Sequence, residues 1–132
     1  MRASGGIAIL DPAPALPSGL PGDVYAAIDV LTPNESETEA LIGTAPRTAA
    51  EGIAAARALI GRGVGTAVVK MGSLGVAYAA ASGDGFLPAF KVVTIDTVAA
   101  GDCFNGALAV ALAEGSSIAA AVRFAAAAGA LS

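Results

Sequence analysis

The segment from Val92 to Glu114 constrains the fold more than any other part of the chain. It begins with the β-branched run Val92–Ile95, passes through small residues at 99–101, and continues into a long stretch rich in alanine and leucine. β-branched residues favour strands, whereas alanine and leucine favour helices. The segment therefore predicts a strand, a tight loop and the N-terminus of a helix.

This junction has the chemical character of an anion site. Small residues let backbone N–H groups approach a ligand closely, and the unpaired N–H groups of a first helical turn carry about half a positive charge. Asp102 stands in that turn. It is either a functional acid or simply the residue that caps the helix, because Asp is favoured at that position. The spacing alone leaves both interpretations open.

The rest of the chain alternates between short apolar runs and helical patterns. The runs that predict strands are 6–10, 28–32, 66–71, 76–80 and 86–90, and the last three are hairpin pieces joined by tight turns at Gly72–Gly75 and Ser82–Gly85. Helices are predicted at 36–42, ended by Gly43, from the Thr48–Glu51 capping box to about residue 61, after residue 101, and from about Ser117. The strands at 6–10 and 28–32 are expected to be buried on both faces. This order predicts an α/β fold with three α/β/α layers and a largely parallel, Rossmann-like sheet.

Length and composition fit a single domain over residues 1–132. Hydrophobic residues make up 55% of the chain, and much of that share is alanine, which suits helices packed closely on a sheet. Both ends look cut, because Arg2–Ser4 resembles the tail of a preceding segment and the last helix runs out without a stop signal. The expected unit is therefore a partial domain.

Charge and residue usage exclude several classes of function. The net charge is −4 and no Lys/Arg cluster occurs, so neither a nucleic acid nor an anionic membrane is an expected partner. The single cysteine, Cys103, excludes an internal disulfide and favours the cytoplasm. The absence of histidine excludes Ser-His-Asp and Cys-His nucleophiles and histidine general bases. Catalysis would rest on carboxylates and backbone groups.

Phosphate-binding motifs of the common types are missing. The chain has no Gly-x4-Gly-Lys-Ser/Thr sequence, and Gly61, Gly63 and Gly65 do not fit Gly-x-Gly-x-x-Gly. Three polar segments remain, each at or near the C-terminal end of a predicted strand. They are Asn34 with Glu37, the turn Lys70–Gly75, and Asp96–Asp102. In a parallel sheet these ends meet at one edge, where ligands bind.

Each of these candidates also has a purely structural interpretation. Asn34 and Glu37 could order water around Mg²⁺ beside a phosphate, or they could simply cap a helix. The turn at 72–75 could be an ordinary connection between strands. Cys103, Phe104 and Phe124 are expected to be packing residues, and Asn105 is left open.

The combination of motifs resembles the ribokinase/PfkB family of carbohydrate kinases, and the resemblance covers nearly the whole chain. Residues 96–107, Asp-Thr-Val-Ala-Ala-Gly-Asp-Cys-Phe-Asn-Gly-Ala, resemble the C-terminal signature of that family. The other segments that carry the resemblance are Asp11–Ala15, Thr32–Glu37 with its Asn-x-x-Glu pattern, Lys70–Gly75, and Arg123–Ser132. The Pro-Ala-Pro-Ala stretch and Ala99 are most similar to the ribokinase branch.

The resemblance implies a role for each matching residue. Asp102 would be the base that removes a proton from a sugar hydroxyl, and Ala99, Ala100 and Gly101 would form the anion hole for the transferred phosphate. Asn34 and Glu37 would organise Mg²⁺ and the phosphates, and Lys70, Gly72, Ser73 and Gly75 would lie along ATP. Ala126 would face the adenine. Asp96 and the Val98 carbonyl would hold a monovalent cation, K⁺.

The implied function is ATP-dependent phosphorylation of a primary hydroxyl of a sugar, with ribose the favoured substrate. A fructokinase and a 2-keto-3-deoxygluconate kinase are the alternatives within the family, and a nucleotide-binding fragment without catalysis is the alternative outside it. The family's N-terminal, sugar-recognising half and its lid have no counterpart in this sequence. The chain is therefore expected to be the nucleotide-binding, C-terminal part of such a kinase, with a homo-oligomer left open.

Overall fold

The computed structural model describes residues 7–11, 21–89 and 97–131, and for residues 97–102, 130 and 131 it describes the course of the backbone alone. The strands in these ranges are β1 (Ile9–Leu10), β2 (Val30–Leu31), β3 (Thr66–Lys70), β4 (Gly75–Ala80) and β5 (Gly83–Pro88). The helices are α1 (Gly22–Ala27), α2 (Glu35–Ile42), α3 (Ala49–Gly61), α4 (Thr97–Ala113) and α5 (Ile118–Leu131).

The described strands form one mixed sheet in the order β1-β2-β3-β4-β5. β1 pairs with β2 and β2 with β3 in parallel, whereas β3 with β4 and β4 with β5 are antiparallel. The prediction of a largely parallel sheet is therefore wrong for this part of the chain. Tight turns join β3 to β4 and β4 to β5, and a parallel pair needs a crossover of about a dozen residues or more.

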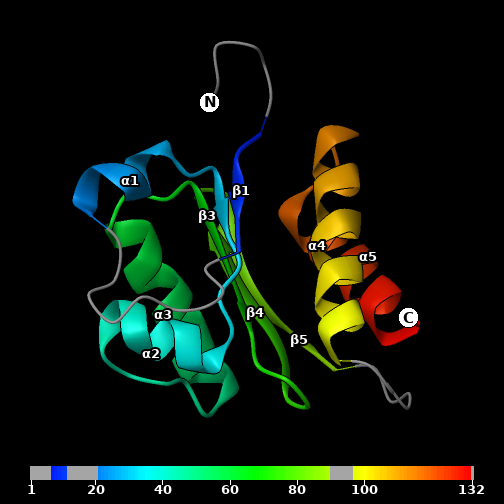
Figure 1. The fold of residues 1–132 in the computed structure, drawn as a ribbon, viewed down its shortest axis with the longest axis horizontal. Helices are drawn as coiled ribbons and strands as arrows, with labels where there is room; N and C mark the ends of the chain where they lie inside the picture. The colour runs from blue at the N-terminus through cyan, green and yellow to red at the C-terminus, as the bar shows by residue number, and fades with distance from the viewer. Residues whose placement is uncertain (1–6, 12–20, 90–96, 132) are drawn as a thin grey trace.

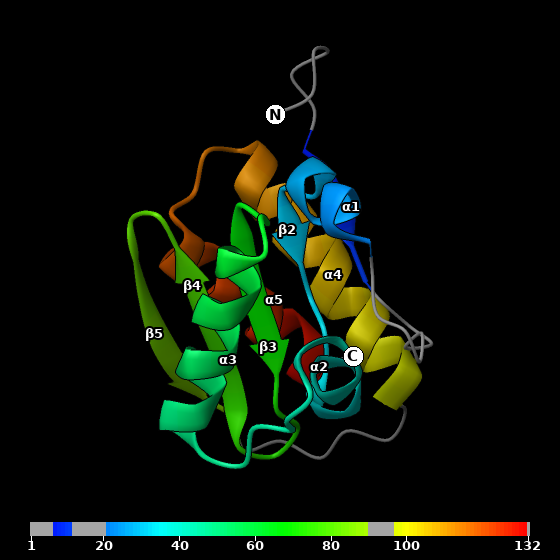
Figure 2. The ribbon, with the colours of Figure 1, turned by 90° about the vertical axis from the view of Figure 1, so that its left-hand side faces the viewer.

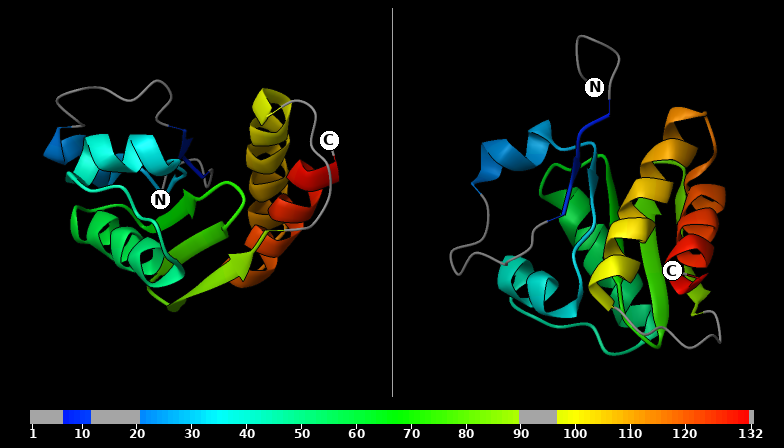
Figure 3. Two further views of the ribbon diagram at one scale, coloured as in Figure 1. Left: turned by 90° about the horizontal axis from the view of Figure 1, so that it is seen from below. Right: turned by 45° about the vertical axis from the view of Figure 1, so that its right-hand side comes forward.

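Helices cover both faces of this sheet. Helices α1, α2 and α3 lie on one side of the strands and α4 and α5 on the other (Figure 1). The view turned by 90° places α3 in front of the sheet and α4 and α5 behind it (Figure 2). The view from below separates the same two groups of helices (Figure 3). The predicted α/β class, with helices on both faces, is confirmed.

Strand β3 is buried on both faces because its side chains alternate between two apolar clusters. Ala67 and Val69 belong to the cluster beneath α1–α3, and Val68 belongs to the cluster beneath α4 and α5. Successive side chains of a strand point to opposite faces, so a continuous apolar run suits a sheet that is covered twice. By contrast, Ile9 and Leu10 of β1 are only half-buried, so the prediction that this strand is buried on both faces is wrong.

Local sequence signals account for the end of α2 and the start of α3. Gly43 follows α2 in the left-handed conformation, with φ +90°, as its position in the sequence predicts. At the start of α3 the Thr48 hydroxyl accepts from the Glu51 N–H, but the Glu51 carboxylate accepts from Arg47 and not from Thr48. Only half of the predicted capping box is therefore present.

Helix α1 has no such local signal, and two other predicted segments lie outside the described residues. The sequence predicts no element at α1, because the helix begins with a glycine and has no side-chain cap at its N-terminus. The predicted strand at Val92–Ile95 and the proline-rich loop after Asp11 lie outside the described residues. None of the helices in the described ranges is long and apolar enough to cross a lipid bilayer.

Candidate active site

Two of the three polar segments lie side by side in the structure. The backbone of Asn34 forms an isolated parallel bridge with that of Lys70, beyond the paired ends of β2 and β3. The Lys70 N–H donates to the Pro33 carbonyl at 2.8 Å. The start of α2 and the end of β3 therefore meet at the carboxyl edge of the parallel strands, as the sequence predicts.

Asn34 and Glu37 form a complete capping box at the start of α2. The Glu37 N–H donates to Asn34 Oδ1 at 2.8 Å, and the Asn34 N–H donates to Glu37 Oε1 at 2.9 Å. Only 6% of Glu37 is exposed, whereas Asn34 is exposed. The structural interpretation of this pair is confirmed, and the cap uses one carboxylate oxygen of Glu37. The role in holding Mg²⁺ stays a prediction.

The segment from Gly72 to Gly75 is a tight turn between β3 and β4. The Leu74 N–H donates to the Met71 carbonyl at 3.1 Å, and Ser73 is exposed. Gly75 has φ +135°, and a Cβ there would overlap the Leu87 carbonyl of the neighbouring strand β5. A glycine is therefore required for the hairpin itself. The interpretation as a turn between strands is confirmed, and the contact with a nucleotide stays a prediction.

The first turns of α4 contain residues 99–101, for which the sequence predicts a loop. The helix begins at Thr97, so Val98, Ala99, Ala100 and Gly101 are helical, and Asp102 lies more than one turn inside. The prediction of a tight loop at 99–101 is wrong, because two alanines favour the helix. Asp102 is also too far along the helix to be its N-cap. Its side chain, like Asp96, lies outside what the structure describes.

Asp11 and Asn105, to which the sequence assigns no role in the site, join α4 to the sheet. Asn105 Nδ2 donates to Asp11 Oδ2 at 2.7 Å, and Lys70 Nζ lies 3.7 Å from the same oxygen. The Lys70 ammonium also lies 6.0 Å from the centre of the Phe104 ring. Asp11 follows β1, so its place at a strand end was the signal that could have identified it.

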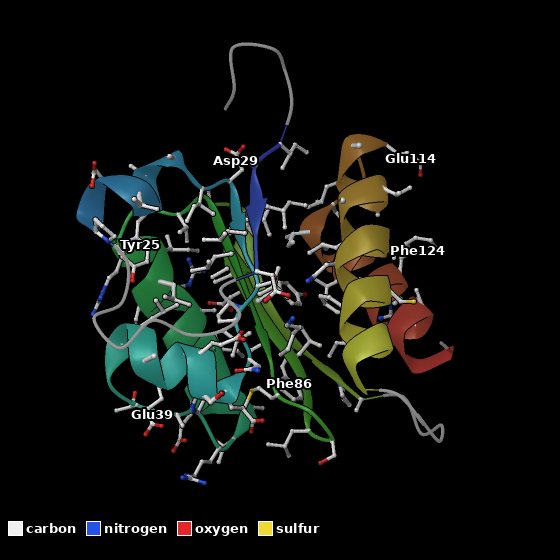
Figure 4. The ribbon with its side chains drawn as sticks, in the orientation of Figure 1. Tyr25, Asp29, Glu39, Phe86, Glu114 and Phe124 are labelled. Carbon is white, nitrogen blue, oxygen red and sulfur yellow. The ribbon has the colours of Figure 1, made fainter. Side chains whose placement is uncertain are left out.

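The remaining candidate residues on α4 and α5 differ in burial. Phe104 is buried in the cluster beneath α4 and α5, as expected. Cys103 is exposed, and Phe124 is 53% exposed on α5 (Figure 4), so the prediction that these two are packing residues is wrong. Ala126 on α5 is half-buried and packs against that same cluster. Its contact with adenine stays a prediction.

The donor atoms at this edge suit a metal that is held partly by a phosphate. No group of three or more Asp, Glu, His or Cys side chains gathers anywhere in the described ranges. Mg²⁺ is usually bound by one or two carboxylates together with phosphates and water, so Glu37 and Asn34 would supply suitable oxygens. The residues present therefore fit a Mg-nucleotide better than a metal held by protein alone.

Comparison with known proteins identifies the family. A model of the pfkB family carbohydrate kinase matches residues 3–132. The chain belongs to the pfkB family. Among its pfkB relatives, the ribokinase of Haemophilus influenzae is 37% identical over 124 residues, which are 94% of this chain and 40% of that protein.

Solved structures of pfkB proteins agree with this assignment. The ribokinase of Thermotoga maritima matches with a TM-score of 0.79 and 42% identity, over 96% of this chain and 42% of that one. The Arabidopsis thaliana ribokinase complexed with ribose and ATP matches with a TM-score of 0.83 and 34% identity, over 97% and 41%. The chain therefore spans about 40% of the length of these pfkB relatives.

Proposed function

We propose that this chain is the nucleotide-binding part of an ATP-dependent sugar kinase. One observation carries the proposal: the start of α2, the end of β3, the end of β1 and Asn105 of α4 meet at one edge of the sheet. Asn34 lies beside Lys70, and both Lys70 and α4 meet at the carboxylate of Asp11. Phosphoryl transfer depends on positioning and charge neutralisation more than on covalent chemistry, and such an edge supplies both.

In this proposal Asp102 is the base that takes the proton of the sugar hydroxyl. A positioned base accelerates proton transfer by about 10²–10⁴-fold. The backbone at Ala99, Ala100 and Gly101 binds the transferred phosphate. Helix α4 begins at Thr97, so the Ala99 N–H lies in the first turn, where N–H groups have no intrahelical acceptor, and it supports this role; the N–H groups of Ala100 and Gly101 lie just beyond that turn.

Cation sites complete the proposed machinery. Glu37 and Asn34 order Mg²⁺ and its water beside the phosphates, and Lys70, Gly72, Ser73 and Gly75 line the nucleotide, with Ala126 near the adenine. Asp96 and the Val98 carbonyl hold K⁺. A cytoplasmic location, expected from the lone cysteine, is part of the same proposal.

Ribose is the proposed sugar. The ribokinases of Haemophilus influenzae and Thermotoga maritima, at 37% and 42% identity, support this choice. A fructokinase or a 2-keto-3-deoxygluconate kinase is the alternative within the family. The other candidate is a nucleotide-binding protein without turnover; the chain as given spans about 40% of the length of these relatives.

Two measurements separate these candidates. Calorimetry of the chain with Mg-ATP measures nucleotide binding, and a coupled assay with ribose, fructose and 2-keto-3-deoxygluconate measures ADP release. The assay is run on the chain and on a chimera in which this chain replaces the matching segment of the Haemophilus influenzae ribokinase. Turnover of ribose by the chain itself supports the proposed kinase and its sugar. Turnover by the chimera supports the phosphoryl-transfer role of this chain alone, because the sugar-recognising half of the chimera comes from the Haemophilus influenzae ribokinase. Binding without turnover in either protein supports the non-catalytic alternative, and the absence of both refutes the nucleotide site.

Asp102→Asn tests the proposed base within the same chimera. The variant is expected to lower sugar-dependent turnover by about 10²-fold or more, with the Kd for Mg-ATP within about threefold of the parent value. Glu114→Gln is the matched control, because Glu114 lies just beyond the far end of α4 (Figure 4) and is exposed. Unchanged turnover in Asp102→Asn would remove the assigned role.

A further inference from the structure

The carboxylate of Asp11 is the meeting point of three elements. It follows β1, accepts a hydrogen bond from Asn105 of α4 at 2.7 Å, and lies 3.7 Å from the ammonium of Lys70 at the end of β3. Both partners are on the same oxygen, Oδ2. The sequence separation between Asp11 and Asn105 is 94 residues, so this bond ties the start of the described chain to α4.

The chemistry of the pair fixes the orientation of Asn105. An ionised carboxylate can only accept hydrogen bonds, so the amide must turn its nitrogen toward Asp11 and its oxygen away. Hydrogen bonds to a charged acceptor are shorter and stronger than neutral ones, which agrees with 2.7 Å. The bond therefore specifies one rotation of α4 about its axis.

Two oxygens of this cluster are buried without a hydrogen-bond partner. They are Asp11 Oδ1 and Asn105 Oδ1, for which the described part of the chain supplies no donor. Leaving a buried acceptor unpaired is costly, and an apolar pair of similar shape would avoid that cost. The cluster is thus a poor device for stability alone, and native structures keep such groups chiefly at functional sites.

The apolar contacts of α4 do not specify its position to the same degree. Phe104 and Leu108 pack with Val68 in the cluster beneath α4 and α5. Such contacts are non-directional, whereas a hydrogen bond fixes both distance and direction. Residue 105 is one turn after residue 102, and positions three apart share a face of a helix. Fixing Asn105 therefore fixes the turn that carries Asp102.

We infer that Asp11 is a positioning residue with two effects. Through Asn105 it sets the first turns of α4, and it holds the Lys70 ammonium beside Phe104. The first turns of α4 and the Lys70 ammonium then face the terminal phosphate of ATP. This inference rests on the proposed function and deepens it. A carboxylate near a triphosphate repels it, so charge alone predicts that removing Asp11 tightens ATP binding. A positioning role predicts the opposite, namely that removing Asp11 weakens ATP binding.

Calorimetry with Mg-ATP and Mg-ADP shows whether the loss of Asp11 tightens or weakens nucleotide binding. Asp11→Ala is expected to weaken Mg-ATP binding by about tenfold, because it removes a charge-assisted hydrogen bond, and to change Mg-ADP binding by less than about twofold. Asp11→Asn keeps an oxygen that can accept from Asn105, so it is expected to stay within about threefold of the parent. A variant that only loosened the fold would weaken both nucleotides equally.

Asp84→Ala is the matched control. Asp84 is a carboxylate of similar side-chain exposure, 37% against 35% for Asp11, and it pairs with Arg57 at 2.8 Å. It is expected to change neither affinity. Mg-ATP binding by Asp11→Ala that equals or exceeds the parent value, or an equal loss of both nucleotides, overturns the inference.

Hydrogen exchange tests the anchoring of α4 without reference to nucleotide. In Asp11→Ala the amides of residues 103–106 are expected to exchange at least about fivefold faster, with those of α5 unchanged, because local opening tracks local contacts. Asn105→Ala removes the other half of the bond and serves if Asp11→Ala does not fold. If the parent protein binds no ATP, the proposed function fails, and hydrogen exchange alone then tests whether Asp11 anchors α4. Faster exchange in Asp11→Ala supports the anchoring, and unchanged exchange overturns it.

Discussion

Asn34 and Glu37 each accept a hydrogen bond from the backbone N–H of the other, and this reciprocal cap uses a single oxygen of the Glu37 carboxylate. The second oxygen takes no part in the cap. The Glu37 side chain can therefore cap the helix with one oxygen and bind a cation with the other. Substitutions can separate them, because the cap needs an oxygen and the cation needs a charge.

Glu37→Gln is expected to separate the cap from the cation site. The amide keeps an oxygen for the Asn34 N–H, so the free energy of unfolding falls only by about 0.3–1 kcal/mol from the lost charge at the N-terminus of α2. Mg²⁺-dependent ATP binding is expected to weaken by about 10-fold or more. Glu37→Ala also leaves that N–H unpaired and is expected to lose about 1–3 kcal/mol. Urea titrations followed by circular dichroism and calorimetry with and without EDTA give the two quantities.

Glu39→Gln provides the control for this pair of variants. Glu39 lies on the same helix, is exposed, and points away from the sheet edge (Figure 4). Its substitution is expected to leave both stability and Mg-ATP binding unchanged. If Glu37→Gln binds Mg-ATP as tightly as the parent, Glu37 is a capping residue and nothing more.

Gly75→Ala is expected to destabilise the protein by at least about 2 kcal/mol. The residue has φ +135°, and a Cβ would overlap the Leu87 carbonyl and lie 2.9 Å from Pro88 Cα. Gly106→Ala is the opposite case, because Gly106 lies inside α4 with nothing within 4 Å of its Cβ position. That variant is expected to gain about 0.5–1 kcal/mol. Urea titrations measure both, and equal effects would contradict the account of the hairpin.

Local sequence signals predicted those elements that local interactions stabilise. The buried run of β3, the Gly43 end of α2 and the Thr48 start of α3 were all identified, because each depends on residues within one turn or one strand. Helix α1 was missed because it lacks a side-chain cap, and its buried residue is Tyr25, which packs in a tertiary cluster. The two tight turns were identified from their glycines, and the antiparallel pairs β3–β4 and β4–β5 follow from them; the prediction of a largely parallel sheet was wrong because these two pairs are half of the strand pairs described.

The candidate site shows the same division. Asn34 with Glu37 and the turn before Gly75 could be found because each is a compact motif. The bond between Asp11 and Asn105 could not be predicted, because two residues 94 positions apart share no pattern that a single sequence would show. Only the packing of α4 against the sheet brings them together.

Leu108→Ala is expected to lower the free energy of unfolding by about 2–5 kcal/mol. Leu108 is fully buried between α4 and the sheet, in the same cluster as Val68. Val110, two residues along the same helix, is 52% exposed, so Val110→Ala is expected to change stability by less than about 0.5 kcal/mol. Urea titrations followed by circular dichroism measure both variants. Similar losses in the two would mean that α4 does not pack on the sheet through the Leu108 face.

Tyr25→Phe is expected to leave the protein equally stable or up to about 1 kcal/mol more stable. The ring is 2% exposed on the α1 side of the sheet (Figure 4), and its hydroxyl is buried with no hydrogen-bond partner among the described residues. Removing an unpaired hydroxyl removes its desolvation cost, while the Arg62 guanidinium, 5.9 Å from the ring centre, keeps its aromatic contact. Tyr25→Ala removes the ring as well and is expected to lose about 3–5 kcal/mol. A loss of more than about 1 kcal/mol in Tyr25→Phe, measured by urea titration, would show that the hydroxyl is paired and that α1 is held by a polar contact as well as by the ring.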